Sequence, residues 1–122
     1  MSALESTITD AFERRAEISP SRVDAVVRDA IEQVIADLDA GRLRVAEKIN
    51  GEWVTHQWVK KAVLLYFRTH DNRLMGTDPA RWFDKVPLKY DGVSESALHA
   101  GGTRVVPPAV ARRGAYIAPG VV

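Results

Sequence analysis

An apolar stripe between residues 23 and 38 constrains the fold more than any other feature of the sequence. Its side chains recur at steps of three and four residues, the spacing of one helix face; they are Val23, Val27, Ala30, Ile31, Val34, Ile35 and Leu38. Ser21, followed three residues later by Asp24, predicts a capping box at the start. Gly41 predicts the left-handed residue that follows a helix end. The pattern therefore predicts one long helix that ends before Gly41.

Three further segments have helical patterns. Leu4, Ile8 and Phe12 are four residues apart and predict a short helix within residues 2–16. Residues 58–69 are apolar enough for a buried helix, with two lysines on its open side. Residues 94–102 predict a short helix that Ser94 caps and that a glycine, 101 or 102, ends.

One segment has the pattern of a β-hairpin. Residues 43–56 alternate around Asn50-Gly51, the dipeptide that best tolerates positive φ at both centres of a type I′ turn. An isolated hairpin is marginal in water, so it must pack on the helices. Residues 70–93 are rich in turn signals and are predicted to be loop. The sequence thus predicts an α+β fold, mostly helical, with one hairpin.

The last eighteen residues divide into three hexads, VVPPAV, ARRGAY and IAPGVV. An aliphatic residue holds the first position of each (Val105, Ala111, Ile117), and a small or β-branched residue holds the fifth (Ala109, Ala115, Val121). This is the pattern of a left-handed parallel β-helix, in which three hexads make one triangular coil and the first position points inward. The spacing alone leaves open an apolar extended tail that packs on the domain.

Composition excludes several function classes. The chain has no cysteine, which removes disulfide frameworks, thiol catalysis and cysteine-ligated metals. Its three histidines are far apart, so no metal site is predicted. Seventeen basic and sixteen acidic residues are interleaved, so no nucleic-acid partner is expected. No apolar run is long enough for a membrane span and no secretory signal pattern opens the chain, so we expect a soluble cytoplasmic protein.

Four segments resemble the bacterial tetrahydrodipicolinate N-succinyltransferase family. They are AFERRAEI (11–18), LRVAEKINGEWVTHQWVKKAVLLYFR (43–68), FDKVPLKY (83–90) and RVVPPAVARRGAYIAPGVV (104–122). The likeness is nearly collinear from residue 8 to residue 122. It is strongest through WVTHQWVKKAVLL and weakest at 72–82 and 91–103.

The resemblance implies a reaction and an assembly. Members of the family transfer a succinyl group from succinyl-CoA, the co-substrate, to the amino group of ring-opened tetrahydrodipicolinate, in the diaminopimelate route to lysine. The amine attacks the thioester directly after a carboxylate deprotonates it. Members are homotrimers with a helical N-terminal domain and a β-helix along which CoA lies, and their active sites lie between subunits. No bound cofactor, metal, nucleic acid or membrane is implied.

The resemblance also implies a division of the chain. Residues 1–103 correspond to the helical N-terminal domain, and residues 104–122 correspond to the first coil of the β-helix. Family chains continue well beyond this point, and their catalytic carboxylates and CoA-binding surface lie in that continuation. We therefore expect no catalytic or cofactor-binding residue within 1–122. An alternative from another class is a stand-alone, non-enzymatic helical module that binds a partner or oligomerises; the residues that follow Val122 would distinguish the two.

Arg104 is the one substrate-binding residue that the resemblance implies. The substrate carries two carboxylates, and a guanidinium matches carboxylate geometry in a bidentate way that lysine cannot. In the family, the arginine at the matching motif position binds substrate. Without the resemblance, Arg104 would be taken for a surface or linker arginine.

The remaining candidates have simpler interpretations. His56 is expected to hydrogen-bond locally at a strand-to-helix junction, and Lys60 and Lys61 are expected on a solvated helix face. Aspartates in the loop 70–93 are better explained by turns than by a cation site, because their spacing does not fit a calcium loop. The three tryptophans are expected to be core or interface aromatics.

Residues 1–122 alone are predicted to be inactive. One coil of a solenoid cannot bury its own inner face, because each repeat relies on its neighbours. We expect no CoA release when the purified polypeptide is incubated with succinyl-CoA and the dicarboxylate. Measurable turnover in that assay would contradict the expectation.

Overall fold

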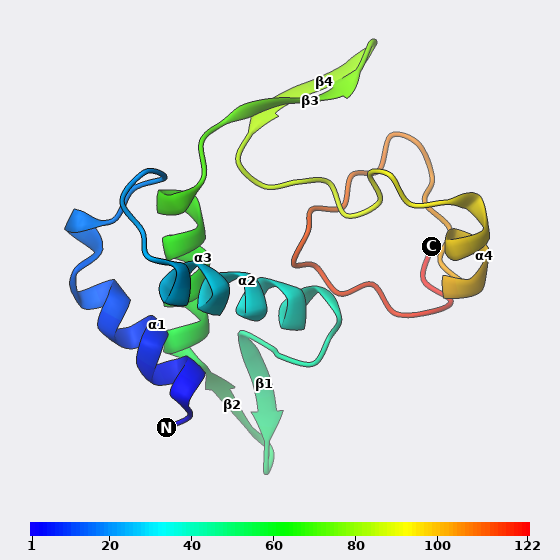
Figure 1. Ribbon diagram of the computed structural model, residues 1–122. Helices are drawn as coiled ribbons and strands as arrows, with labels where there is room; N and C mark the ends of the chain where they lie inside the picture. Colours follow the sequence, from blue (N-terminus) through cyan, green and yellow to red (C-terminus); the bar gives the residue numbers. More distant parts are fainter.

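A computed structural model describes residues 1–122 and places three mutually packed helices at one end of the molecule (Figure 1). The helices are α1 (Ala3–Glu13), α2 (Ala25–Asp39) and α3 (Gln57–Thr69), and a 3₁₀ turn at Arg15–Glu17 follows α1. A single cluster of 14 buried apolar side chains lies between them. We refer to this part as the helical core.

Helix α2 forms where the stripe predicts it. All of its stripe residues from Val27 to Leu38 are buried. The predicted cap is wrong: the N-cap is Asp24 rather than Ser21, because the Asp24 carboxylate accepts a hydrogen bond from the Val27 N–H at 2.9 Å. Gly41 follows the helix with a φ of 75°, as the sequence predicts.

Helices α1 and α3 complete the helical core. Ile8 of α1 is fully buried, and Leu4 and Phe12 pack beside it, so the predicted stripe is confirmed. Helix α3 begins one residue before the predicted start and contributes Val59 and Leu65, which are fully buried. The apolar faces of three short helices thus cover one another.

The predicted hairpin connects α2 to α3. Strands β1 (Ala46–Ile49) and β2 (Glu52–Thr55) pair antiparallel. Asn50 and Gly51 between them have φ values of 51° and 83°, the positive values that a type I′ turn requires.

A second hairpin corrects the prediction of a single one. Strands β3 (Arg73–Thr77) and β4 (Ala80–Asp84) pair antiparallel within the segment predicted to be loop. The two hairpins project from opposite sides of the molecule (Figure 1). The alternation that signals a half-buried strand is missing because this hairpin lies away from the core: Leu74 and Phe83, opposite each other in the register, are both exposed.

The three tryptophans, expected to be core or interface aromatics, have different surroundings. Trp58 packs against the helical core from its edge. Trp53 on β2 is 73% exposed, and Trp82 on β4 is also exposed. Because these two lie on projecting hairpins, neither belongs to the core; an interface role for them stays a prediction.

Helix α4 (Glu95–Gly101) stands at the other end of the molecule. Ser94 caps it by accepting a hydrogen bond from the Ala97 N–H at 3.2 Å, and Gly102 ends it with a φ of 70°. Both features match the sequence prediction. None of the helices has the length and hydrophobicity that a membrane span requires.

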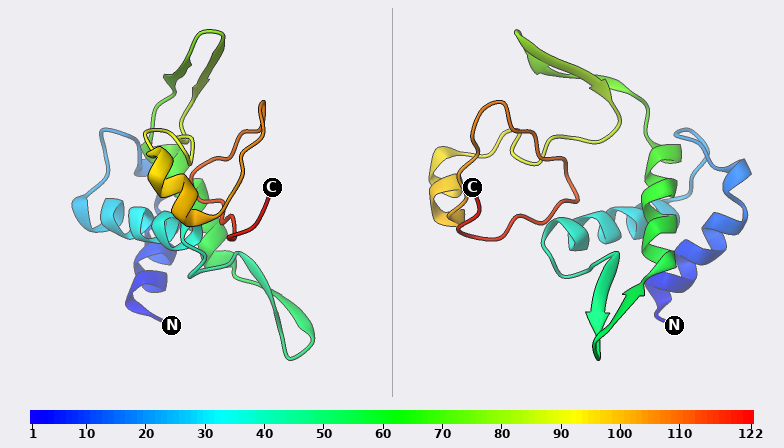
Figure 2. Two further views of the ribbon diagram at one scale, coloured as in Figure 1. Left: turned by 90° about the vertical axis from the view of Figure 1, so that its right-hand side faces the viewer. Right: turned by 180° about the vertical axis from the view of Figure 1, so that it is seen from behind.

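Residues 104–122 form one closed loop without a named strand or helix (Figure 2). Three turn hydrogen bonds recur six residues apart: Ala109 N–H to Val106, Ala115 N–H to Arg112, and Val121 N–H to Ala118. The loop then closes, because the Arg104 N–H donates to the Val121 carbonyl at 3.0 Å. The turns have the predicted six-residue period, but the β-helix coil itself stays a prediction because no strand is present. We call these residues the closed loop.

Two neighbouring leucines of α3 test the helical core. Leu65 is fully buried, whereas Leu64 is 48% exposed. Leu65→Ala should lower the free energy of unfolding by about 3 kcal/mol, because it leaves a cavity among packed side chains. Leu64→Ala, the control, should change it by less than about 1 kcal/mol. Urea denaturation followed by circular dichroism measures both, and equal losses would contradict this description of the core.

Candidate functional site

Arg104 stands where the chain leaves α4 and enters the closed loop. Its backbone is fixed by the bond to Val121, while its side chain is exposed. Its guanidinium takes part in none of the seven ion pairs of the chain. An uncommitted guanidinium on a fixed backbone is suited to bidentate binding of a carboxylate.

The side of the closed loop next to Arg104 is hollow and apolar. The hollow has a volume of about 450 Å³. Val105, Ala111 and Ile117, the first residues of the three hexads, all line it. These are the side chains that the hexad pattern predicts to face a common interior.

Asp39, the last residue of α2, joins the helical core to the closed loop. Its carboxylate accepts hydrogen bonds from the Gly114 N–H at 2.9 Å and from Lys89 Nζ at 2.8 Å. Lys89 Nζ also donates to the Asp39 carbonyl at 3.0 Å. One residue thus holds the end of α2, the segment before α4 and a corner of the loop.

The hydrogen bonds to Asp39 change its acidity. Burial by itself would raise the pKa of Asp39, but the hydrogen bonds from Lys89 and Gly114 oppose it, together with the positive charges of Lys89 and Arg113. The net effect is a pKa below the ordinary value of 3.8. The carboxylate is therefore ionised at neutral pH, the form in which it accepts both bonds.

Two arginines flank the same corner of the loop. Arg113 binds both carboxylate oxygens of Glu32 on α2, and Arg112 binds Asp84 at the end of β4 at 2.6 Å. The hydrogen bond to Glu32 raises the pKa of Arg113. The backbone hydrogen bond from Lys85 lowers the pKa of Asp84 most, and further bonds from Val86 and Arg112 lower it too, against an opposing effect of desolvation. Burial raises the pKa of the nearby Tyr66 phenol.

Tyr116 makes an aromatic contact between the loop and the turn after α2. A side-chain carbon added at Gly41 would lie 2.8 Å from the Tyr116 ring, so the ring lies directly on the Gly41 backbone. The guanidinium of Arg44 lies 4.7 Å from the centre of the same ring. Gly41 therefore serves two purposes, the positive φ and the close approach of Tyr116.

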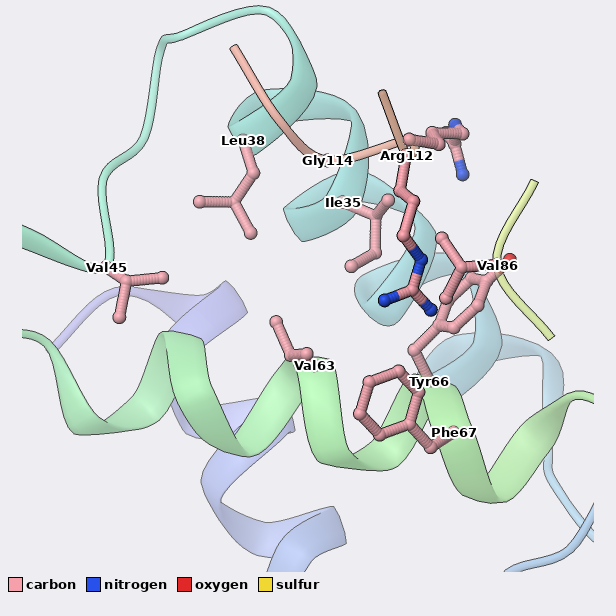
Figure 3. Close-up of a pocket in the computed structure, with 10 residues that line it drawn as sticks. Ile35, Leu38, Val45, Val63, Tyr66, Phe67, Val86, Arg112 and Gly114 are labelled. Carbon is pink, nitrogen blue, oxygen red and sulfur yellow. The ribbon is translucent and has the colours of Figure 1, made fainter. Parts of the chain in front are cut away.

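A smaller cavity, of about 240 Å³, lies between α2, α3 and this corner (Figure 3). Ile35 and Leu38 of α2 and Val63 and Phe67 of α3 face it. The other residues that line it are Val45, Tyr66, Val86, Arg112, Arg113 and Gly114. Its walls contain no carboxylate or histidine, so they offer neither a metal site nor a general base.

The other candidate residues lie far from Arg104 in the fold. His56 Nε2 lies 2.9 Å from the Glu47 carboxylate at the junction of β2 and α3, so the predicted local role is confirmed. Lys60 is exposed, and Lys61 Nζ lies 5.4 Å from the centre of the Phe12 ring. No group of three or more histidine, aspartate or glutamate side chains is arranged to hold a metal ion.

Sequence reasoning missed the residues that join the two parts. Asp39, Lys89, Arg113 and Gly114 were not singled out, although they hold the loop on the helices. One signal was present in the sequence: the middle hexad, ARRGAY, has two arginines and a tyrosine where the other hexads are apolar. That interruption marks the side of the loop that faces the helical core.

Comparison with known proteins identifies close relatives. A family described as tetrahydrodipicolinate N-succinyltransferase N-terminal matches residues 3–69. The chain is 60% identical over 119 residues to 2,3,4,5-tetrahydropyridine-2,6-dicarboxylate N-succinyltransferase of Bordetella pertussis, which covers 98% of the chain and 44% of that protein. The protein of the same name from Edwardsiella ictaluri is 59% identical over 118 residues, which is 97% of the chain and 43% of that protein. The chain thus spans less than half the length of these relatives.

The lowered pKa of Asp39 predicts a pH-dependent contribution to stability. Because the folded pKa lies below the unfolded value of 3.8, the contribution is present above that value and is lost as the pH falls through the folded pKa. Asp39→Asn should lower the free energy of unfolding at pH 7 by about 1–2 kcal/mol, through loss of charge-assisted hydrogen bonds. The difference in unfolding free energy between variant and wild type should become smaller as the pH falls below the pKa of Asp39 in the unfolded chain. Urea titrations at several pH values measure this difference. A gap independent of pH would contradict this assignment.

Proposed function

The chain belongs to the tetrahydrodipicolinate N-succinyltransferase N-terminal family, and from that premise we propose that it is the N-terminal part of an enzyme that succinylates tetrahydrodipicolinate from succinyl-CoA. The amine of the ring-opened substrate attacks the thioester carbonyl. A carboxylate takes the amine proton as the C–N bond forms; the C–S bond then breaks, and CoA leaves as its thiol when the protonated carboxyl group returns that proton to the sulfur. The part of this work that falls to residues 1–122 is to bind the dicarboxylate.

The placement of Arg104 carries this proposal. Its guanidinium is exposed and free of ion pairs, and its backbone is fixed at the closure of the loop. A substrate carboxylate would accept two parallel N–H bonds from it. The similarity to the relatives named above covers 97–98% of the chain and so includes this position.

The closed loop is proposed to be the first coil of a left-handed β-helix. Three observations support this: turns every six residues, a return to the starting point after one set of three hexads, and a shared hollow lined by the first residue of each hexad. In a solenoid each coil covers the inner face of its neighbour. A following coil would cover the apolar hollow and place CoA alongside.

The assembly proposed with this function is a cytoplasmic homotrimer with active sites between subunits. Its support is the resemblance to the family, together with the exposed apolar side chains of the closed loop and the second hairpin. The partners are the dicarboxylate and succinyl-CoA, without nucleic acid or membrane.

The activity is tested on the whole protein that carries this chain. CoA thiol release should require both succinyl-CoA and tetrahydrodipicolinate, and mass spectrometry should find the N-succinylated product. Absence of release with the folded protein would favour the alternative of a non-enzymatic module.

Substitution of Arg104 tests the binding role. In the whole protein, Arg104→Lys should raise the KM for the dicarboxylate about tenfold, because lysine cannot make the bidentate pair. The KM for succinyl-CoA should change less. Arg22→Lys is the control, since Arg22 is an exposed arginine of the helical part outside all ion pairs. Unchanged kinetics in Arg104→Lys would remove Arg104 from the site.

A further inference from the structure

The hydrogen bonds that join the closed loop to the helical core and to the segment before α4 lie at one corner of the loop. Every hydrogen bond between residues 105–122 and residues 1–101 involves the segment 111–114. Two of these bonds are between backbones: the Lys89 N–H to the Ala111 carbonyl and the Arg113 N–H to the Pro87 carbonyl, both at 2.9 Å. The orientation of the loop on the helices therefore depends on this corner.

Apolar burial does not fix that orientation. All fifteen buried residues lie between Ile8 and Val86, so none belongs to the closed loop. The side-chain hydrogen bonds of the corner involve Asp39, Arg112 and Arg113, and the Tyr116 ring lies on Gly41. Because no loop residue is fully buried, these polar contacts contribute to how the loop sits.

The polar contacts of the corner differ in solvent exposure. The side chains of Arg112 and Asp84 are 53% and 41% exposed, and Glu32, the partner of Arg113, is 53% exposed. Pairs exposed to this degree contribute little, because water and salt screen them. Asp39 and Lys89 are only 31% and 14% exposed. The Asp39 carboxylate also holds the loop backbone directly, through the Gly114 N–H. Arg113 itself is 26% exposed, so the pair of Asp39 with Lys89 is the least exposed of the three ion pairs at this corner.

A displacement of the corner reaches Arg104 through the loop. The three turns fix the shape of the loop, and the Arg104 N–H is bonded to Val121 beyond the third turn. The Gly120 N–H also donates to the Gly102 carbonyl at 2.7 Å, which holds the residues before Arg104 against the same turn. A tilt of the loop at Gly114 thus tilts Arg104 relative to the helical core.

We infer that Asp39 is a positioning residue for Arg104: by holding Gly114 and Lys89, it sets the orientation in which the arginine meets the substrate. The inference rests on the proposed role of Arg104. Asp39 itself does not touch substrate in this scheme. Its effect is on how the dicarboxylate is bound. A misplacement of about 1 Å from the productive geometry can lower activity by up to about 100-fold.

Kinetics of the whole protein test the inference, with a matched control on the same helix. Asp37 lies two residues before Asp39 on α2. Its side chain makes hydrogen bonds only to Gln33 and Arg42, at 3.0 and 2.9 Å. Asp39→Ala should raise the KM for the dicarboxylate about tenfold, with a smaller rise for Asp39→Asn. The KM for succinyl-CoA should stay within about twofold of wild type. Asp37→Asn should leave both KM values unchanged.

Amide hydrogen exchange of the 122-residue chain gives a second readout that needs no activity. Asp39→Asn should speed exchange at the N–H groups of Gly114 and Arg104. Exchange at Leu65, in the helical core, should not change. Asp37→Asn should leave all three amides as in wild type.

The outcomes separate the inference from the proposed function. If the wild-type protein transfers succinyl and Asp39→Ala keeps the wild-type KM for the dicarboxylate, the inference is overturned and the function stands. Equal rises in both KM values, or the same effect from Asp37→Asn, would indicate general destabilisation and would also overturn it. If the wild-type protein transfers nothing, the proposed function fails, and unchanged exchange at the Arg104 N–H then overturns the coupling as well.

Discussion

The hydrogen bonds that the Asp39 carboxylate accepts join the helical core of this protein to its closed loop, and the inferred placement of Arg104 depends on them. Asp39 lies at the C-terminal end of α2, where the helix dipole disfavours a negative charge and where carbonyl groups lack partners within the helix. The Lys89 ammonium offsets both effects: it pairs with the Asp39 carboxylate, and it donates a hydrogen bond to the carbonyl of the same residue. The Gly114 N–H donates a further hydrogen bond to the Asp39 carboxylate. A local problem at a helix end is thus solved by groups that come from the other part of the chain.

The two parts of the molecule are held together by different forces. Three helices bury their apolar faces against one another, and all fully shielded side chains belong to this part. The closed loop buries nothing to the same degree and is shaped by turns and backbone hydrogen bonds. Its orientation therefore depends on polar contacts, which respond to pH and salt more than apolar contacts do.

This division suits the proposed function. A binding arginine must be placed within a fraction of an ångström, and the loop that carries Arg104 has no core of its own to place it. The contacts to α2 supply the placement from outside. The middle hexad has charged and aromatic residues for this reason, whereas the outer hexads keep valines that line the hollow. The apolar hollow is left for the continuation of the proposed β-helix to cover.

The sequence alone determined the features that depend on neighbours in the chain. Apolar residues at helical spacing placed α1, α2 and α3, and Asn50-Gly51 placed the first hairpin, because helix faces and tight turns are set by residues a few positions apart. The likeness to the family and the six-residue period of the last segment were also readable. Only the tertiary structure decided the second hairpin, which lacks a buried face to impose alternation. It alone also decided the contact of Asp39 with Gly114, 75 positions away, and of Glu32 with Arg113, 81 positions away. Such contacts form when two folded parts meet, so they leave no periodicity in the sequence from which they could be predicted.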